Sequence, residues 1–137
     1  MKPVNAALAN EFHVWQRDAL PRCVIQDLDA WAIVASDPES YEPAALFELK
    51  RSSAAPEAWR PYAADRANYA SLDMLARRAG IPLFVVYWQK GRPIDDETLF
   101  RVTRFSDVVP EYHGRAAIVS AQTFAERFPY PLVELAP

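Results

Sequence analysis

Glu48 and Lys50 are the residues of this 137-residue chain whose types and spacing most directly suggest chemistry. They lie in the segment AALFELKR, residues 44–51, whose apolar start favours a buried β-strand. Side chains alternate between the two faces of a strand, so Glu48 and Lys50 share one face, while Phe47 and Leu49 are expected to point into the core. Such a pair either takes part in metal-assisted chemistry or forms an exposed ion pair worth about 0–1 kcal/mol.

A second acidic segment, VIQDLDAW at residues 24–31, places Asp27 and Asp29 on one face of a strand. The turn residues of the segment 36–43, SDPESYEP, favour a hairpin that returns the chain antiparallel beside this strand. Asp29 then comes close to Glu48 in a plausible register. Two carboxylates about 4 Å apart repel by roughly 4 kcal/mol at an effective dielectric constant of about 20, so a bound divalent cation would stabilise the cluster.

Two helices and an apolar strand are expected to hold these residues in place. Residues 3–20 favour a helix with Glu11 at the edge of its apolar stripe, and residues 62–79 favour another helix that ends at Gly80. Residues 83–88 favour a buried strand, and because a helix connects it to strand 44–51, the two strands should be parallel. The expected inward-facing side chains are Leu8, Phe12, Trp15 and Ala19 in the first helix and Tyr69, Leu72, Leu75, Ala76 and Ala79 in the second.

The remaining segments complete an α/β sandwich in which helices flank a mixed central β-sheet. Residues 23–34 are expected to form the first strand, and residues 52–61 and 89–97 to form loops. A further strand is expected at residues 98–105, and residues 116–119 form a short apolar segment. A last helix is expected over residues 120–128, with Ser120 as its cap.

The tryptophans separate into two groups by their surroundings. Trp15, Trp31 and Trp88 fall in apolar runs, so we expect them in the core. Trp59 lies in the loop 52–61 beside Arg60, where it either stacks on nucleic acid or anchors the loop.

Composition predicts a single domain, residues 1–137, with an ordinary globular balance of 51% hydrophobic and 24% charged residues. The single cysteine, Cys23, excludes an internal disulfide and favours a reducing, cytoplasmic location. No apolar run reaches the length of a membrane span, and the first residues lack a signal-peptide pattern. A net charge of −3 excludes a bulk electrostatic grip on nucleic acid, although residues 50–78 carry six basic against three acidic side chains.

The order of these segments resembles the PD-(D/E)XK nuclease superfamily, which includes many restriction enzymes, Holliday-junction resolvases and phage or repair nucleases. The resemblance rests on a helix with Glu11, the motif DLD at residues 27–29, the motif FELK at residues 47–50, and the helix and apolar strand that follow. It covers residues 5–88, about two-thirds of the chain. The resemblance implies a restriction-endonuclease-like α/β fold.

Site roles follow from the resemblance residue by residue. Asp29 and Glu48 match the two metal-binding carboxylates, the backbone carbonyl of Leu49 a further metal ligand, and Lys50 the lysine that orients the attacking water. Supporting roles are implied for Glu11, for Asp27 and for Asn68, which is the amide nearest to the second-helix glutamine of some branches. Arg51, Trp59 and Arg60 are expected to contact nucleic acid.

The function implied is that of a nuclease, an endonuclease more than an exonuclease, that uses Mg²⁺ or Mn²⁺ to hydrolyse phosphodiester bonds. The expected partner is nucleic acid, with DNA favoured, and no membrane; the small size is compatible with a homodimer. The alternative is a catalytically inactive nuclease-like module that binds or regulates, in a phage- or toxin-related setting.

Overall fold

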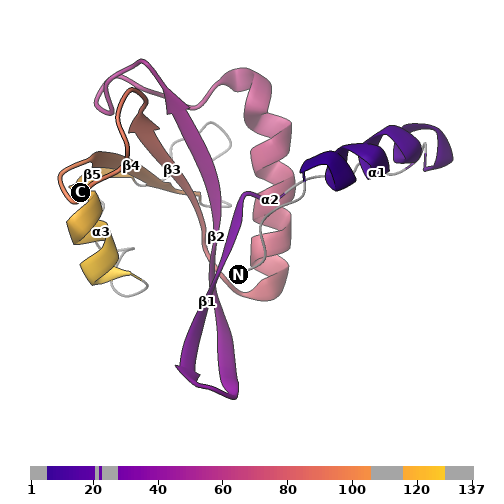
Figure 1. Cartoon of the computed structure of the whole chain (residues 1–137), viewed down its shortest axis with the longest axis horizontal. Helices are drawn as coiled ribbons and strands as arrows, with labels where there is room; N and C mark the ends of the chain where they lie inside the picture. Colours follow the sequence, from indigo (N-terminus) through magenta and orange to yellow (C-terminus); the bar gives the residue numbers. More distant parts are fainter. Residues whose placement is uncertain (1–5, 21, 23–27, 106–115, 129–137) are drawn as a thin grey trace.

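The computed structural model of the chain describes residues 6–20, 22, 28–105 and 116–128. Figure 1 shows a twisted sheet with a helix on either side and a further helix near the N-terminus. None of the described helices has the length and apolar content needed to cross a membrane. In chain order the elements are α1 (Ala6–Ala19), β1 (Ala30–Asp37), β2 (Ser40–Ser52), the 3₁₀ turn η1 (Ala63–Asp65), α2 (Arg66–Ala79), β3 (Leu83–Gln89), β4 (Leu99–Arg104), β5 (Ala116–Ser120) and α3 (Ala121–Arg127).

The five strands form one mixed open sheet in the order β1-β2-β3-β4-β5. Among the described strands only β2 and β3 are parallel, and α2 connects them, so the predicted crossover is confirmed. The β1–β2 pair is antiparallel with Ala30 opposite Phe47, which confirms the predicted hairpin. Its turn is much shorter than expected, because the strands continue to Asp37 and restart at Ser40. The coarse prediction of an α/β protein with a mixed sheet is therefore confirmed.

Helix α2 covers one face of the sheet. Leu72 and Ala76 of the helix pack with Leu46 and Leu83 of the strands in a buried cluster. The helix ends at Gly80, whose φ of 71° allows its backbone N–H to reach the carbonyls of the last turn. The expected inward face of α2 was too wide: Leu75 and Ala79 are exposed, because α2 contacts the sheet along a narrow stripe.

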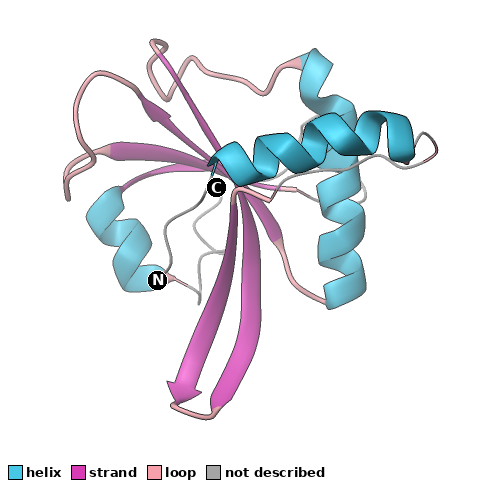
Figure 2. Ribbon diagram, turned by 45° about the vertical axis from the view of Figure 1, so that its right-hand side comes forward, coloured by secondary structure: helices cyan, strands magenta, loops and turns pink. Residues whose placement is uncertain are grey.

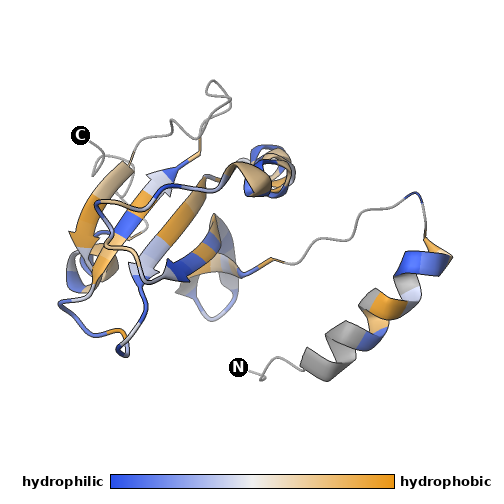
Figure 3. Cartoon of the chain, turned by 90° about the horizontal axis from the view of Figure 1, so that it is seen from above, coloured by the Kyte–Doolittle hydropathy of each residue, from blue (hydrophilic) through white to orange (hydrophobic). Residues whose placement is uncertain are grey.

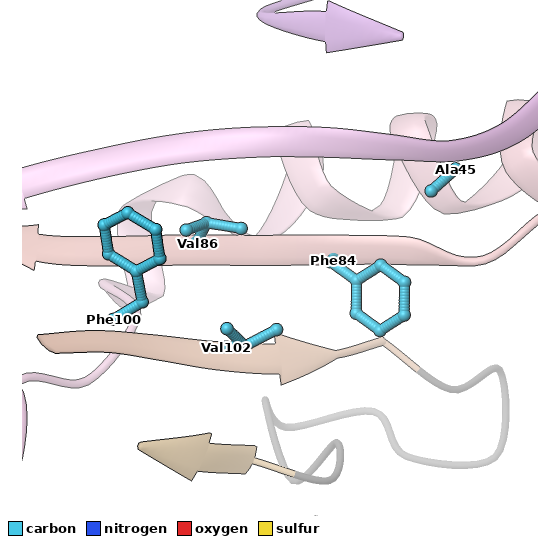
Figure 4. Close-up of a cluster of buried hydrophobic side chains, with 5 residues drawn as sticks. All are labelled: Ala45, Phe84, Val86, Phe100 and Val102. Carbon is cyan, nitrogen blue, oxygen red and sulfur yellow. The ribbon is translucent and has the colours of Figure 1, made fainter. Parts of the chain in front are cut away.

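The other face of the sheet carries the largest apolar cluster. Figure 4 shows its buried members, which project from β2, β3 and β4, and α3 covers them. Phe47 of β2 contacts the rings of Phe124 and Phe128 in α3, with centroids 5.8 and 5.4 Å apart. Ser120 caps α3 as predicted, since its Oγ accepts a hydrogen bond from the Thr123 N–H. The buried members of this cluster are Ala45, Phe84, Val86, Phe100 and Val102.

Two apolar segments expected in the core are exposed instead. Figure 3 shows α1 apart from the sheet, and its Phe12 and Trp15 are 49% and 56% exposed. The turn end of the β1–β2 hairpin extends beyond the helices in Figure 2. Trp31, opposite Leu46 on the edge strand β1, is 55% exposed. The predicted burial of Trp15 and Trp31 is therefore wrong, because no described helix covers these segments. Trp88 is half-buried, and Leu49, which was expected in the core, is exposed.

Trp59 is a buried anchor of the loop between β2 and η1. Its side chain is 3% exposed, and its ring stacks on Tyr87 of β3 with centroids 4.3 Å apart and an interplanar angle of 7°. The Tyr87 hydroxyl in turn donates to the carbonyl of Ala54 at 2.6 Å. The loop is thus held to the α2-side face of the sheet by this aromatic stack and by hydrogen bonds from side chains of the strands to its carbonyls.

The exposure of the two tryptophans predicts very different costs for the same substitution. Trp59→Ala should lower the free energy of unfolding by about 3–5 kcal/mol, because it removes a buried aromatic side chain. Trp31→Ala is the matched control and should cost about 1 kcal/mol or less, as is usual for surface sites. Urea unfolding followed by circular dichroism measures both, and equal losses would contradict this account of the core.

Candidate active site

Pairing of β1 with β2 brings Asp29 against Glu48 and Leu49. Asp29 directly precedes β1, and its Oδ2 accepts a hydrogen bond from the Leu49 N–H at 2.9 Å. Its carboxyl group also lies close enough to that of Glu48 to raise the pKa of Glu48. The expected proximity of Asp29 and Glu48 is therefore confirmed, and the strand register that it required is the observed one.

Lys50 lies on the same face of β2 as Glu48 and joins it to α2. Its Nζ is 3.5 Å from Glu48 Oε1 and 3.5 Å from Asp65 Oδ2, at the N-terminal end of α2. The same ammonium group faces the ring of Tyr69 at 5.7 Å from its centroid, within cation–π range. The lysine is thus fixed in position by two carboxylates and one aromatic ring.

Glu48 is buried, which sets this group apart from a surface ion pair. Its exposed fraction is 6%, whereas Asp29 is exposed. Burial raises the pKa of Glu48, and the neighbouring Asp29 raises it further by charge repulsion and by a hydrogen bond, while Lys50 acts in the opposite direction. The alternative of an exposed ion pair is therefore wrong for Glu48. A cation held between Asp29 and Glu48 would relieve the same repulsion.

The donor set of the site is oxygen-rich but small. Among the described residues no group of three or more His, Cys, Asp or Glu side chains is placed to hold a metal ion. Asp29 and Glu48 supply two carboxylates. Because the Leu49 N–H points toward Asp29, the Leu49 carbonyl, on the same edge of the strand, points that way too. Two carboxylates, a carbonyl and water fit Mg²⁺, which retains several waters when bound to proteins.

The supporting residues named from the sequence do not join this cluster. Glu11 is exposed on α1, which Figure 3 shows apart from the sheet, so of its two interpretations, a solvated residue or a part of the acidic cluster, the structure agrees with the first. Asp27 lies outside the described residues. Asn68 lies in the first turn of α2, three residues after Asp65, and its supporting role stays a prediction.

The three residues expected to contact nucleic acid have different surroundings. Arg51 pairs with Trp88 and, by strand alternation, projects from the face of the sheet opposite to Lys50. The Trp59 ring is buried against Tyr87 and serves as a loop anchor, not as a stacking platform. Arg60 is exposed on the same face as Lys50, beside the Trp59 that covers Tyr87.

Asp65 and Tyr69 are parts of the site that the sequence did not indicate. Asp65 precedes α2 by one residue, and its spacing to Tyr69 is one helical turn. That spacing placed both on one side of the helix, but nothing in the sequence showed which residue of β2 they would face. Only the packing of α2 on β2 brings them to Lys50.

Comparison with protein families, with characterised proteins and with solved structures finds no match to this chain.

The raised pKa of Glu48 predicts how stability varies with pH. A carboxyl group with a pKa raised on folding binds its proton more tightly in the folded state. Its stabilising contribution is present below the ordinary value of 4.5 and is lost as the pH rises through the raised pKa. In metal-free buffer, wild type should therefore lose more stability than Glu48→Gln between about pH 4 and about pH 7.

Urea unfolding at the two pH values measures this difference, and Glu57→Gln, an exposed glutamate outside the site, is the matched control. The control should retain the pH dependence of wild type. Equal pH dependence in wild type and Glu48→Gln would show that Glu48 titrates normally.

Proposed function

We propose that this protein is a metal-dependent nuclease of the restriction-endonuclease-like type, which hydrolyses phosphodiester bonds with Asp29, Glu48 and Lys50. The observation that carries the proposal is the convergence of two carboxylates and one lysine at the β1–β2 pair. Further support comes from the mixed sheet with a parallel β2–β3 pair joined by α2, as the resemblance implies.

Asp29 and Glu48 would hold Mg²⁺ or Mn²⁺ together with the Leu49 carbonyl. When bound, the metal ion polarises a phosphoryl oxygen and acidifies a water molecule. Glu48 is buried, and an ionised buried carboxylate is stable only beside a compensating positive charge, so this position favours a bound cation. The hydrogen bond from the Leu49 N–H fixes one oxygen of Asp29 and leaves the other for a ligand.

Lys50 would orient the attacking water and offset negative charge that develops on the phosphoryl group. Its ammonium group is a point charge with three donors, and Glu48 and Asp65 take up two directions around it. A third donor then remains for water or a phosphate oxygen. Asp65 and Tyr69 act as positioning residues that hold Lys50 on the α2 side of the sheet.

A non-catalytic module is the second candidate, and one observation favours it. Glu48, Lys50 and Asp65 form an ion-pair chain that links β2 to α2, which is a structural role by itself. Under that alternative the protein cleaves no nucleic acid, and replacing Lys50 would lower only its stability. The same variant therefore separates the two candidates.

Lys50→Met should abolish cleavage while metal binding is retained, because the lysine is assigned to water activation and not to the metal. The assay uses plasmid, branched DNA and RNA with Mg²⁺ or Mn²⁺, and Lys90→Met, an exposed loop lysine, is the matched control. A wild type that cuts none of these substrates, or a Lys50→Met variant that cuts as well as wild type, refutes the assignment.

Metal binding can be measured without knowledge of the substrate. At a tenfold excess of Mg²⁺ over its dissociation constant, wild type should gain about 1.4 kcal/mol of stability, which is several degrees in melting temperature. Asp29→Asn removes one ligand charge, so its melting temperature should rise much less on metal addition. In metal-free buffer the same variant should be no less stable than wild type, because the repulsion with Glu48 is removed.

Calcium serves as the non-catalytic control in this titration. Equal metal-induced shifts in wild type and Asp29→Asn would remove Asp29 from the site. No shift with Mg²⁺, Mn²⁺ or Ca²⁺ would favour the non-catalytic module.

A further inference from the structure

Arg101 of β4 faces the same side of the sheet as Lys50. Lys50 pairs with Tyr87 in the β2–β3 register, and Tyr87 pairs with Arg101 in the β3–β4 register. Directly paired residues of neighbouring strands project from the same face. Two strand spacings separate the Cα atoms of Lys50 and Arg101, which is about 10 Å.

Arg101 is held against the loop that Trp59 anchors. Its Nη1 donates to the carbonyl of Pro56 at 3.5 Å. Arg60 approaches the same part of the loop, because its side chain contacts the carbonyl of Glu57, the residue after Pro56. Arg60 is fixed in turn, because its Nη1 donates to the carbonyls of Trp59 and Glu57 at 2.7 and 3.0 Å.

Within the described part of the chain these two guanidinium groups have no negative partner. Among the described residues no carboxylate lies within ion-pair distance of Arg60 or Arg101. The buried Nε–H of Arg101 also has no hydrogen-bond acceptor in the described part of the chain. Burial lowers the pKa of Arg101, and the positive charge of Arg60 lowers it further. Two cations held together without compensation would be stabilised by a bound anion.

We propose that Arg60 and Arg101 form an anion site that binds a non-scissile phosphate group of a nucleic-acid strand. Guanidinium groups suit this ligand, because their planar donors match phosphate oxygens in pairs. The Cα separation of about 10 Å from Lys50 places this pair beside the candidate active site, on the same face of the sheet. The choice of nucleic acid as the source of the phosphate rests on the proposed nuclease function.

The neighbouring pocket does not extend this site. It has a volume of about 500 Å³ and shares Pro56 with the Arg101 contact. Lys90 and Arg92 line it together with Asp95 and Glu97, so its charges are mixed. We therefore restrict the anion site to Arg60 and Arg101.

The test measures binding, so that it does not depend on cleavage. Fluorescence anisotropy with labelled single-stranded and duplex oligonucleotides, in buffer with Ca²⁺ in place of Mg²⁺, gives the affinity at several salt concentrations. Arg60→Gln and Arg101→Gln should each weaken binding about three- to tenfold. The double variant should lower the salt slope by about 0.7 to 0.9, the contribution of one phosphate, and each single variant by less, because the remaining arginine still faces that phosphate.

Arg78→Gln is the matched control, because it removes the same charge from an exposed position near the C-terminal end of α2. It should bind like wild type. Arg101→Lys should restore most of the salt slope but not the full affinity, because it keeps the charge and loses the paired donors. Melting temperatures verify folding, and Arg60→Gln, an exposed loop position, keeps the test decisive if Arg101→Gln unfolds.

The outcomes separate this inference from the proposed function. Wild type that binds oligonucleotides with the expected arginine dependence but never cleaves them supports the anion site and refutes the nuclease. Cleavage by wild type with unchanged binding in both arginine variants refutes the anion site and leaves the nuclease standing. A wild type that binds neither DNA nor RNA, or an equal loss in Arg78→Gln, overturns the anion site.

Discussion

The antiparallel pairing of β1 with β2 is the constraint on which the site depends. Ala30 opposite Phe47 is the register that lets Asp29, one residue earlier, reach the N–H of Leu49 and the carboxyl group of Glu48. Because side chains alternate along a strand, a slip of one residue would turn Glu48 and Lys50 to the opposite face. The aromatic contacts of Phe47 with α3 oppose such a slip, since Phe47 would then leave the apolar face.

Much of this arrangement is present in the sequence as local pattern. Alternation in residues 44–51, the turn residues after β1 and the unbroken apolar run of β3 were sufficient for the hairpin, the parallel pair and the approach of Asp29 to Glu48. Gly80 and Ser120 marked helix boundaries because a left-handed backbone and a capping hydroxyl have local causes. Features with local physical causes were therefore the predictable ones.

The wrong predictions of burial share one cause: an apolar stripe shows that a segment has an apolar face, but not which element packs against it. The helical spacing of Phe12 and Trp15 predicted a buried face, yet α1 lies apart from the sheet. Trp31 has the alternation of a core strand, but it lies on β1, the edge strand of the sheet, and is 55% exposed there. Asp65 was missed for the converse reason, because its contact with Lys50 joins segments that only tertiary packing brings together.

The α2-side face of the sheet carries three kinds of charged group, which differ in how far neighbouring groups neutralise their charge. Glu48 is buried beside Asp29 and is only partly neutralised by Lys50, whereas Lys50 is compensated twice. Among the described residues, Arg60 and Arg101 contact backbone carbonyls and no carboxylate. A cation at the carboxylates and a phosphate at the arginines would each relieve one imbalance, and the sheet holds the two places about two strand spacings apart. A single phosphodiester strand with its metal ion supplies both charges, which is why the two proposals concern one surface.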